Sequence, residues 1–339
     1  MAKAFISGCS DTVLTADERA FFSAERPWGL ILFARNIRSH EQVRDLVADW
    51  REAVGDAQAP VLIDQEGGRV RRLRPPLVAD YPAGEVYGRL HAQDREAGLR
   101  MAWAGARLIA ADLADLGITV DCAPILDVPA STTSDVIGDR AYARDPETIA
   151  AIGRAVADGL LAGGVLPVIK HIPGHGRATV DSHLELPVVD ASARDLRAVD
   201  FIPFKALADL PLGMTAHIVF TALDGERCAT QSPVMIDLIR SEIGFDGALM
   251  ADDVSMKALG GEMGERVEKL FAAGCDLALH CNGEMVEMRS VADAAPELAG
   301  EALRRCSAAL ARRRDAEPLD RTALRAEFED LLARGRHGA

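Results

Sequence analysis

The sequence is short of positive charge, and of lysine in particular. Its 339 residues contain 38 Lys and Arg against 52 Asp and Glu, which gives a formal net charge of −14. A nucleic-acid partner is therefore not expected, because binding phosphates requires a basic surface. Only five of the basic residues are lysines, so a lysine inside a motif, such as Lys170, is less likely to be there by chance.

Long apolar runs and paired cysteines are also missing. No segment approaches the ~18 uninterrupted apolar residues of a membrane span, and the N-terminus has no apolar stretch of signal-peptide length. We therefore expect no membrane partner and a cytoplasmic location. The six cysteines are far apart and form no CxxC pair, which predicts reduced core residues rather than disulfides.

Short apolar runs of strand length alternate with segments of helical periodicity. This alternation is typical of parallel β/α architecture, and eight such runs predict a single (β/α)8 TIM-type barrel. A doubly wound open sheet is the alternative. The predicted strands are Ala4–Ser7, Trp28–Phe33, Val61–Ile63, Ile118–Val120, Leu166–Ile169, Leu212–Thr215, Ala248–Ala251 and Leu277–Leu279.

The intervening helices have recognisable ends. One predicted helix, with apolar residues from Leu99 to Leu113, is closed by Gly117, and another begins at Asp145-Pro146 and stops at Gly163-Gly164. No repeat or linker marks a boundary, so residues 1–339 are expected to form one domain. The helices from about residue 298 to 339 are expected to pack outside the barrel.

Polar residues follow most of the predicted strands. In a barrel the active site lies at the carboxyl ends of the strands, so this distribution predicts a site there. A single polar residue at the end of a strand is common and needs no functional explanation. Polar residues at the ends of most strands are not explained in this way. The residues concerned are Asp64, Asp121, Lys170-His171, His217, Asp252-Asp253 and His280-Cys281-Asn282.

The densest polar segment is Lys170–Gly176, followed by Asp181-Ser182-His183. Its glycines and proline predict a loop after the strand. Asp181 and His183 are two residues apart, so in extended chain both side chains lie on one side. A carboxylate beside an imidazole suits a proton shuttle near neutral pH, although a lone pair of this kind is more commonly structural.

Asp252 and Asp253 lie at a strand-to-helix turn. One of them is expected to cap the following helix, and the other to point into the barrel mouth, where a carboxylate can attack an electrophilic carbon. Asp64 and Arg72, eight residues later, could form hydrogen bonds with the hydroxyls of a sugar ring. Arg140 in its bare sequence context is more typical of a surface residue.

A metal site is a competing hypothesis. His171, His175, His183 and Asp252 could supply ligands, but the spacing is not that of HExxH, and Lys170 would repel a cation. We therefore predict no metal and no cofactor. A metal-dependent barrel hydrolase and a catalytically silent sugar-binding protein remain as alternatives from other classes.

Several of these motifs together resemble glycoside hydrolase family 3, and within it the NagZ-type β-N-acetylglucosaminidases. They occur in the same order over nearly the whole chain. The chain departs from the family pattern at three positions: Ile172 replaces a common phenylalanine, Val254 a common leucine and Ala251 a frequent serine. The matching segments are 64–70, 137–140, 170–176, 181–183, 214–217, 251–256 and 273–276.

The resemblance implies a cytoplasmic barrel enzyme that removes terminal N-acetylglucosamine from peptidoglycan fragments carrying 1,6-anhydro-N-acetylmuramic acid and peptide. Asp252 resembles the family nucleophile, His183 the general acid/base and Asp181 its partner. The sugar-binding residues that the resemblance implies are Asp64, Arg72, Arg140, Lys170 and His171.

The resemblance leaves two points open. Relatives with a histidine acid/base can act as phosphorylases, so that alternative stays open. We expect a monomer acting on a small-molecule substrate.

Overall fold

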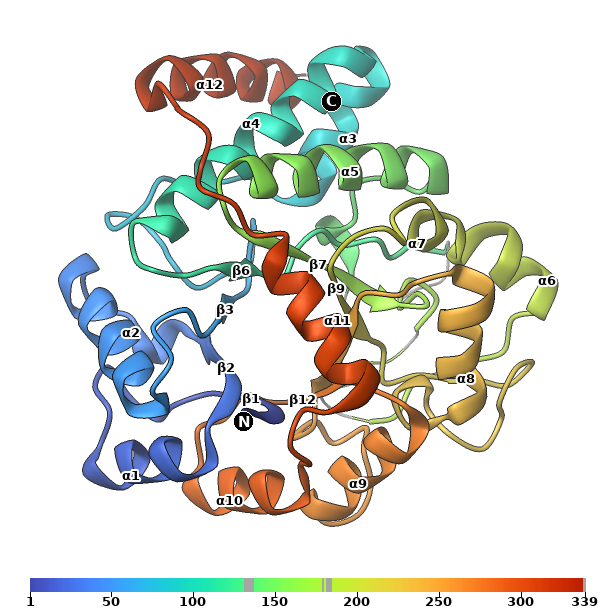
Figure 1. Cartoon of the computed structure of the whole chain (residues 1–339). Helices are drawn as coiled ribbons and strands as arrows, with labels where there is room; N and C mark the ends of the chain where they lie inside the picture. The colour runs from blue at the N-terminus through green and yellow to red at the C-terminus, as the bar shows by residue number, and fades with distance from the viewer. Residues whose placement is uncertain (131–136, 179, 181–184, 338–339) are drawn as a thin grey trace.

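Eight parallel strands close into a barrel surrounded by helices (Figure 1). The computed structural model describes residues 1–130, 137–178, 180 and 185–337. Neighbouring strands follow the chain order, and β12 pairs with β1 at Phe5↔Ala278, which closes the sheet. The barrel prediction is confirmed, and the open-sheet alternative is wrong. The barrel strands are β1 (Lys3–Ser7), β2 (Pro27–Leu32), β3 (Val61–Ile63), β6 (Val120–Asp121), β7 (Leu166–Ile172), β9 (Leu212–Thr215), β11 (Ala248–Asp253) and β12 (Leu277–His280).

Helices connect most of the barrel strands, and β3 is followed by a short antiparallel hairpin. The longer helices are α1 (Ala16–Glu25), α2 (His40–Val54), α3 (Gly84–Gln93), α4 (Arg95–Ala114), α5 (Pro146–Ala162), α9 (Met263–Ala273), α10 (Met285–Ala294), α11 (Gly300–Ala311) and α12 (Arg321–His337). The shorter ones are α6 (Ala193–Asp195), α7 (Ile202–Ala206) and α8 (Pro233–Leu238). Two small sheets lie outside the barrel, β4 (Gln65–Gly67) with β5 (Val70–Arg71), and β8 (Val188–Val189) with β10 (Val219–Phe220).

The predicted strands all overlap observed ones, with one consequential difference at β7. This strand continues to Ile172, because Lys170 pairs with Met214 of β9 and its carbonyl accepts the amide of Leu126. Lys170 and His171 therefore belong to the strand tip, not to the loop in which the glycines and proline placed them. A sheet position holds both residues more firmly than a loop would.

The predicted helix ends are borne out by local geometry. Asp145 accepts the amide of Thr148 with its side chain, and Pro146 is the first residue of α5. After α4, Gly117 has a φ of +76°, a left-handed conformation that favours glycine and turns the chain into β6.

Apolar side chains alternate between the two sides of the barrel wall. Ile6, Leu62 and Met250 belong to a core inside the barrel, whereas Phe5 and Ile63 belong to the larger core beneath the helices. This is the two-residue period of a strand buried on both faces.

The last two helices occupy different places. In Figure 1, α11 crosses in front of the barrel, and its Cys306 and Ala309 join the interior core beneath the amino ends of the strands. Helix α12 packs on α3 and α4, with Phe328 fully buried. Because α11 covers one end of the barrel, access to the interior is left at the carboxyl ends of the strands. No helix among the described residues is long and apolar enough to cross a membrane.

Candidate active site

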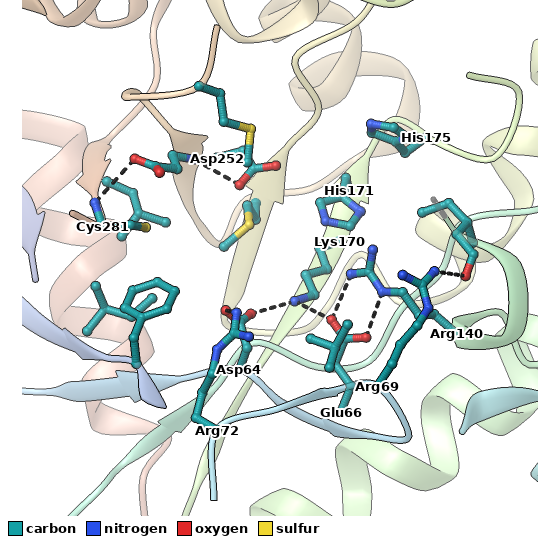
Figure 2. Close-up of a pocket in the computed structure, with 18 residues that line it drawn as sticks. Asp64, Glu66, Arg69, Arg72, Arg140, Lys170, His171, His175, Asp252 and Cys281 are labelled. Atoms are coloured by element: carbon teal, nitrogen blue, oxygen red, sulfur yellow. Dashed lines mark hydrogen bonds and ion pairs between the residues drawn. The ribbon is translucent and has the colours of Figure 1, made fainter. Parts of the chain in front are cut away.

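A cavity of about 280 Å³ opens at the carboxyl ends of the barrel strands (Figure 2). Its walls combine charged groups with a few apolar side chains. The lining residues are Ile31, Phe33, Asp64, Glu66, Arg69, Val70, Arg72, Ile137, Arg140, Lys170, His171, His175, Met214, Asp252, Asp253, Met256, Leu279 and Cys281. All six of the predicted site residues that lie in the described part of the chain are in this set. His183 and Asp181 lie outside the described residues.

Ion pairs form one side of the cavity (Figure 2). The Lys170 ammonium, only 2% exposed, lies 2.8 Å from Asp64 Oδ1 and 2.8 Å from Glu66 Oε1. Arg72 donates to Asp64 Oδ2 at 2.8 Å, and Arg140 donates to both oxygens of Glu66 at 2.8 and 2.9 Å. Two buried carboxylates and three cations therefore hold one another in place.

The electrostatics keep this cluster ionised. Burial alone would raise the pKa of Asp64, but the charges of Lys170 and Arg72 outweigh it and hold that pKa well below its usual value. For Lys170, burial opposes the charged form, yet Asp64 and Glu66 raise its pKa above the ordinary lysine value. The cavity thus presents fixed charges and N–H donors at any pH near neutrality.

The expectation that Arg140 is a surface residue is wrong. Its side chain is only 13% exposed and forms a bidentate ion pair with Glu66. Glu66, which the sequence analysis did not select, is two residues from Asp64 in extended chain. Both carboxylates therefore face the same way, and that spacing could have identified Glu66.

Asp252 lies near the end of β11 and lines the cavity. One of its oxygens, Oδ1, accepts the amide of Asp253 at 2.8 Å. Burial alone would raise the pKa of Asp252, but the imidazole of His171 makes the largest opposing contribution, and the pKa is lowered overall. The side chain is therefore an anion at neutral pH, as a carboxylate nucleophile must be.

The expectation that one of the two aspartates caps the following helix is wrong, and Asp253 has a different role. Its carboxylate accepts the amide and the hydroxyl of Ser255, and also the amide of Cys281 at 3.2 Å. The next helix, α9, begins only at Met263. Asp253 thus closes a turn and ties the tip of β11 to the neighbouring strand, which supports the position of Asp252.

Another carboxylate, the fully buried Asp127, holds the two histidines that follow Lys170. Its Oδ2 lies 2.7 Å from His171 Nδ1, and its Oδ1 accepts the amides of His171 at 3.2 Å and His175 at 2.6 Å. Sequence analysis missed Asp127. The available signal was a single acid within the otherwise apolar segment 123–128, which follows β6.

Four of the polar residues at the predicted strand ends do not line this cavity: Asp121, His217, His280 and Asn282. Asp121 is buried beneath it, where Oδ1 accepts the amide of Gln65. His217 is buried with Nδ1 2.8 Å from Thr230 Oγ1, and His280 is buried with Nε2 2.9 Å from Glu287. Strand ends therefore contribute both to the cavity and to the packing around it.

Within the described part of the chain, no group of three His, Cys, Asp or Glu side chains has the arrangement of a metal site. The six cysteines are buried and unpaired, as predicted.

Comparison with known proteins identifies the family. A model of the glycosyl hydrolase family 3 N terminal domain matches residues 14–312. A β-hexosaminidase of Methylococcus capsulatus is 40% identical over 277 residues, which are 79% of this chain and 80% of the relative.

Solved structures agree with this match. The structure of NagZ from Neisseria gonorrhoeae in complex with N-trifluoroacetyl-D-glucosamine has a TM-score of 0.85 and 28% identity, covering 100% of this chain and 98% of that one. The glycoside hydrolase family 3 β-N-acetylglucosaminidase of Paenibacillus sp. has a TM-score of 0.86 and 28% identity, covering 99% of this chain and 67% of that one. The chain therefore belongs to glycosyl hydrolase family 3.

Proposed function

We propose that the protein is a retaining exo-β-N-acetylglucosaminidase with Asp252 as its nucleophile. The observation that carries this proposal is the anionic Asp252 in a barrel-mouth cavity, beside the charged cluster around Lys170. Membership in a family whose similar relatives are β-hexosaminidases supports the same activity.

The reaction takes place in two displacements. Asp252 attacks the anomeric carbon and forms a covalent glycosyl-enzyme, while the leaving oxygen takes a proton from His183, which Asp181 orients. Water then gives a proton to His183 and attacks the same carbon, which releases the sugar and restores the carboxylate of Asp252. The two inversions together retain the β configuration. The roles of His183 and Asp181 rest on the family resemblance of segment 181–183.

The cavity favours a single terminal sugar. At about 280 Å³ it is at the small end of ligand sites, which supports exo rather than endo action. Asp64, Arg72, Arg140, Lys170 and His171 line it and would bind the sugar hydroxyls and the N-acetyl group. Their mutual ion pairs fix the donors before substrate arrives, so little ordering is required on binding.

The natural substrate that we propose is a peptidoglycan fragment in which N-acetylglucosamine precedes 1,6-anhydro-N-acetylmuramic acid and peptide. The protein would then act in cell-wall recycling in the cytoplasm, as a single catalytic domain of residues 1–339 and as a monomer, without a cofactor. The family resemblance of the chain supports these assignments.

The test is hydrolysis of p-nitrophenyl β-N-acetylglucosaminide, with the β-glucoside in parallel, with and without a chelator, and over a range of phosphate concentrations. Asp252→Asn should lower kcat by at least ~10³-fold, because it removes a nucleophile. Asp112→Asn, at a partly buried aspartate bonded to Tyr81 outside the cavity, is the matched control and should retain activity.

The outcomes separate the alternatives. Turnover of the N-acetyl substrate with a β-configured first product, abolished in Asp252→Asn, supports the proposal. Acceleration by phosphate with release of sugar 1-phosphate would instead identify a phosphorylase. Loss of activity with the chelator would indicate a metal enzyme, and binding without turnover a silent sugar-binding protein.

A further inference from the structure

The contacts of Asp127 bear on the chemistry of the cavity as well as on its shape. Asp127 is fully buried, and its Oδ2 lies 2.7 Å from Nδ1 of His171. Burial alone would raise the pKa of Asp127, but the hydrogen bonds that it accepts from His171 and from the amide of His175 favour the carboxylate, and the pKa is lowered overall. An ionised carboxylate only accepts hydrogen bonds, so Nδ1 of His171 must carry a proton.

The proton on Nδ1 determines what the other ring nitrogen presents. When the His171 imidazole is neutral, only one of its ring nitrogens is protonated, so Nε2 keeps its lone pair. His171 lines the cavity, and with Nδ1 bound to Asp127, Nε2 is the ring nitrogen available to a ligand there.

Nε2 adds an uncharged acceptor to a side of the cavity that is dominated by ion pairs. Lys170, Arg72 and Arg140 offer only N–H donors, and the carboxylate oxygens of Asp64 and Glu66 share their lone pairs with these cations. A sugar hydroxyl both donates and accepts hydrogen bonds. Nε2 of His171 would supply the partner for the hydroxyl proton.

We propose that Asp127 is a positioning residue that holds His171 in the Nδ1–H tautomer, so that Nε2 accepts a hydrogen bond from a hydroxyl of the bound sugar. The identity of the bound ligand in this inference rests on the proposed function. The tautomer itself does not depend on it.

Replacing Asp127 by asparagine should invert the tautomer. The amides of His171 and His175 both donate to Oδ1, so the side-chain NH₂ cannot turn toward them without leaving buried donors unpaired. The amide oxygen must therefore stay at the Oδ1 position, and the NH₂ must face His171. Nδ1 then accepts, and the proton moves to Nε2.

Two measurements test this inference. Long-range ¹H–¹⁵N correlation spectra of the labelled protein, at a pH where the imidazole is neutral, report which ring nitrogen is protonated, and His171→Gln identifies the signal. We expect Nδ1–H in the wild type and Nε2–H in Asp127→Asn. We also expect kcat/KM for the N-acetylglucosaminide to fall by about 10–100-fold, the loss typical of removing a carboxylate that orients a functional histidine.

Asp112→Asn provides the matched control, since it replaces another aspartate in a side-chain hydrogen bond and should change neither the His171 signal nor kcat/KM. A purely structural role of Asp127 predicts lower stability in Asp127→Asn with the tautomer unchanged, and that result would overturn the proposal. So would Nε2–H in the wild type, or an inverted tautomer with normal kcat/KM.

Two further outcomes are distinguishable. If Asp127→Asn does not fold, the wild-type spectrum alone decides whether Asp127 holds the Nδ1–H form. If the wild type does not turn over N-acetylglucosaminides, the proposed function fails, while the spectra, recorded without substrate, still test the action of Asp127 on His171.

Discussion

Removing the buried charge of Lys170 should be among the most destabilising single changes near the cavity. Lys170→Met keeps the apolar stem but leaves the carboxylates of Asp64 and Glu66 without their shared cation. Removing one partner of a buried ion pair typically costs about 3–5 kcal/mol. Because Asp64 keeps Arg72 and Glu66 keeps Arg140, we expect the lower end, about 3 kcal/mol at pH 7.

The cost of Lys170→Met should depend on pH with a defined sign. In the wild type the pKa of Asp64 lies below its ordinary value, so its contribution to stability is present above pH ~4 and is lost as the pH falls through the folded pKa. Without the ammonium, the pKa values of Asp64 and Glu66 should rise, and the carboxyls take up protons in the folded variant as the pH falls. The difference from wild type should therefore be largest at pH 7 and smaller at pH 5.

Guanidinium chloride unfolding at both pH values measures this difference. Lys205→Met, which breaks an exposed pair with Glu242, is the matched control and should cost at most ~1 kcal/mol. Asp64→Asn combined with Lys170→Met should cost less than the sum of the two single changes. A loss below ~1 kcal/mol at pH 7, or an equal loss at pH 5 and pH 7, would refute the reasoning.

Three further predictions concern stability. Burial raises the pKa of Asp121 to about 7, so ionisation of this group lowers the stability of the protein as the pH rises from ~4 through 7. Asp121→Asn should therefore be more stable than wild type by roughly 2–4 kcal/mol at pH 8 and should gain nothing at pH 4, which unfolding curves at both pH values measure. Gly88→Ala should cost about 1–3 kcal/mol, because the added Cβ would overlap the carbonyl of Tyr142, whereas Gly260→Ala, with open space around it, should lie within ~0.5 kcal/mol of wild type in the same unfolding assay. Phe328→Ala should cost about 3–5 kcal/mol and make α12 sensitive to limited proteolysis, and unchanged proteolysis would contradict the docking of this helix.

Local patterns in the sequence predicted much of the fold and part of the site. Apolar runs of strand length placed all eight barrel strands, and polar residues at their ends placed Asp64, Lys170 and Asp252 at one end of the barrel. These predictions succeed because the period of a strand and the common direction of parallel strands follow from local chain geometry.

Other features could not be predicted from neighbours in sequence. The glycines and proline after Lys170 indicated a loop, but pairing with β9 extended β7 through this residue. The double aspartate indicated a helix cap, but Asp253 instead accepts the amide of Cys281, the residue that follows β12. In both cases a contact across the sheet overrode the local preference.

The sequence by itself determined the strand and helix periodicity, the carboxyl-end location of the site and the family to which the chain belongs. Only the tertiary structure decided which charges meet: Glu66 pairs with Arg140, 74 residues away, and Asp127 holds His171, 44 residues away. The physical reason is that a carboxylate has no intrinsic preference among the cations and imidazoles of the chain. Its partner is selected by closure of the barrel, which brings distant strand ends within about 3 Å, where a buried charge must find a counterpart.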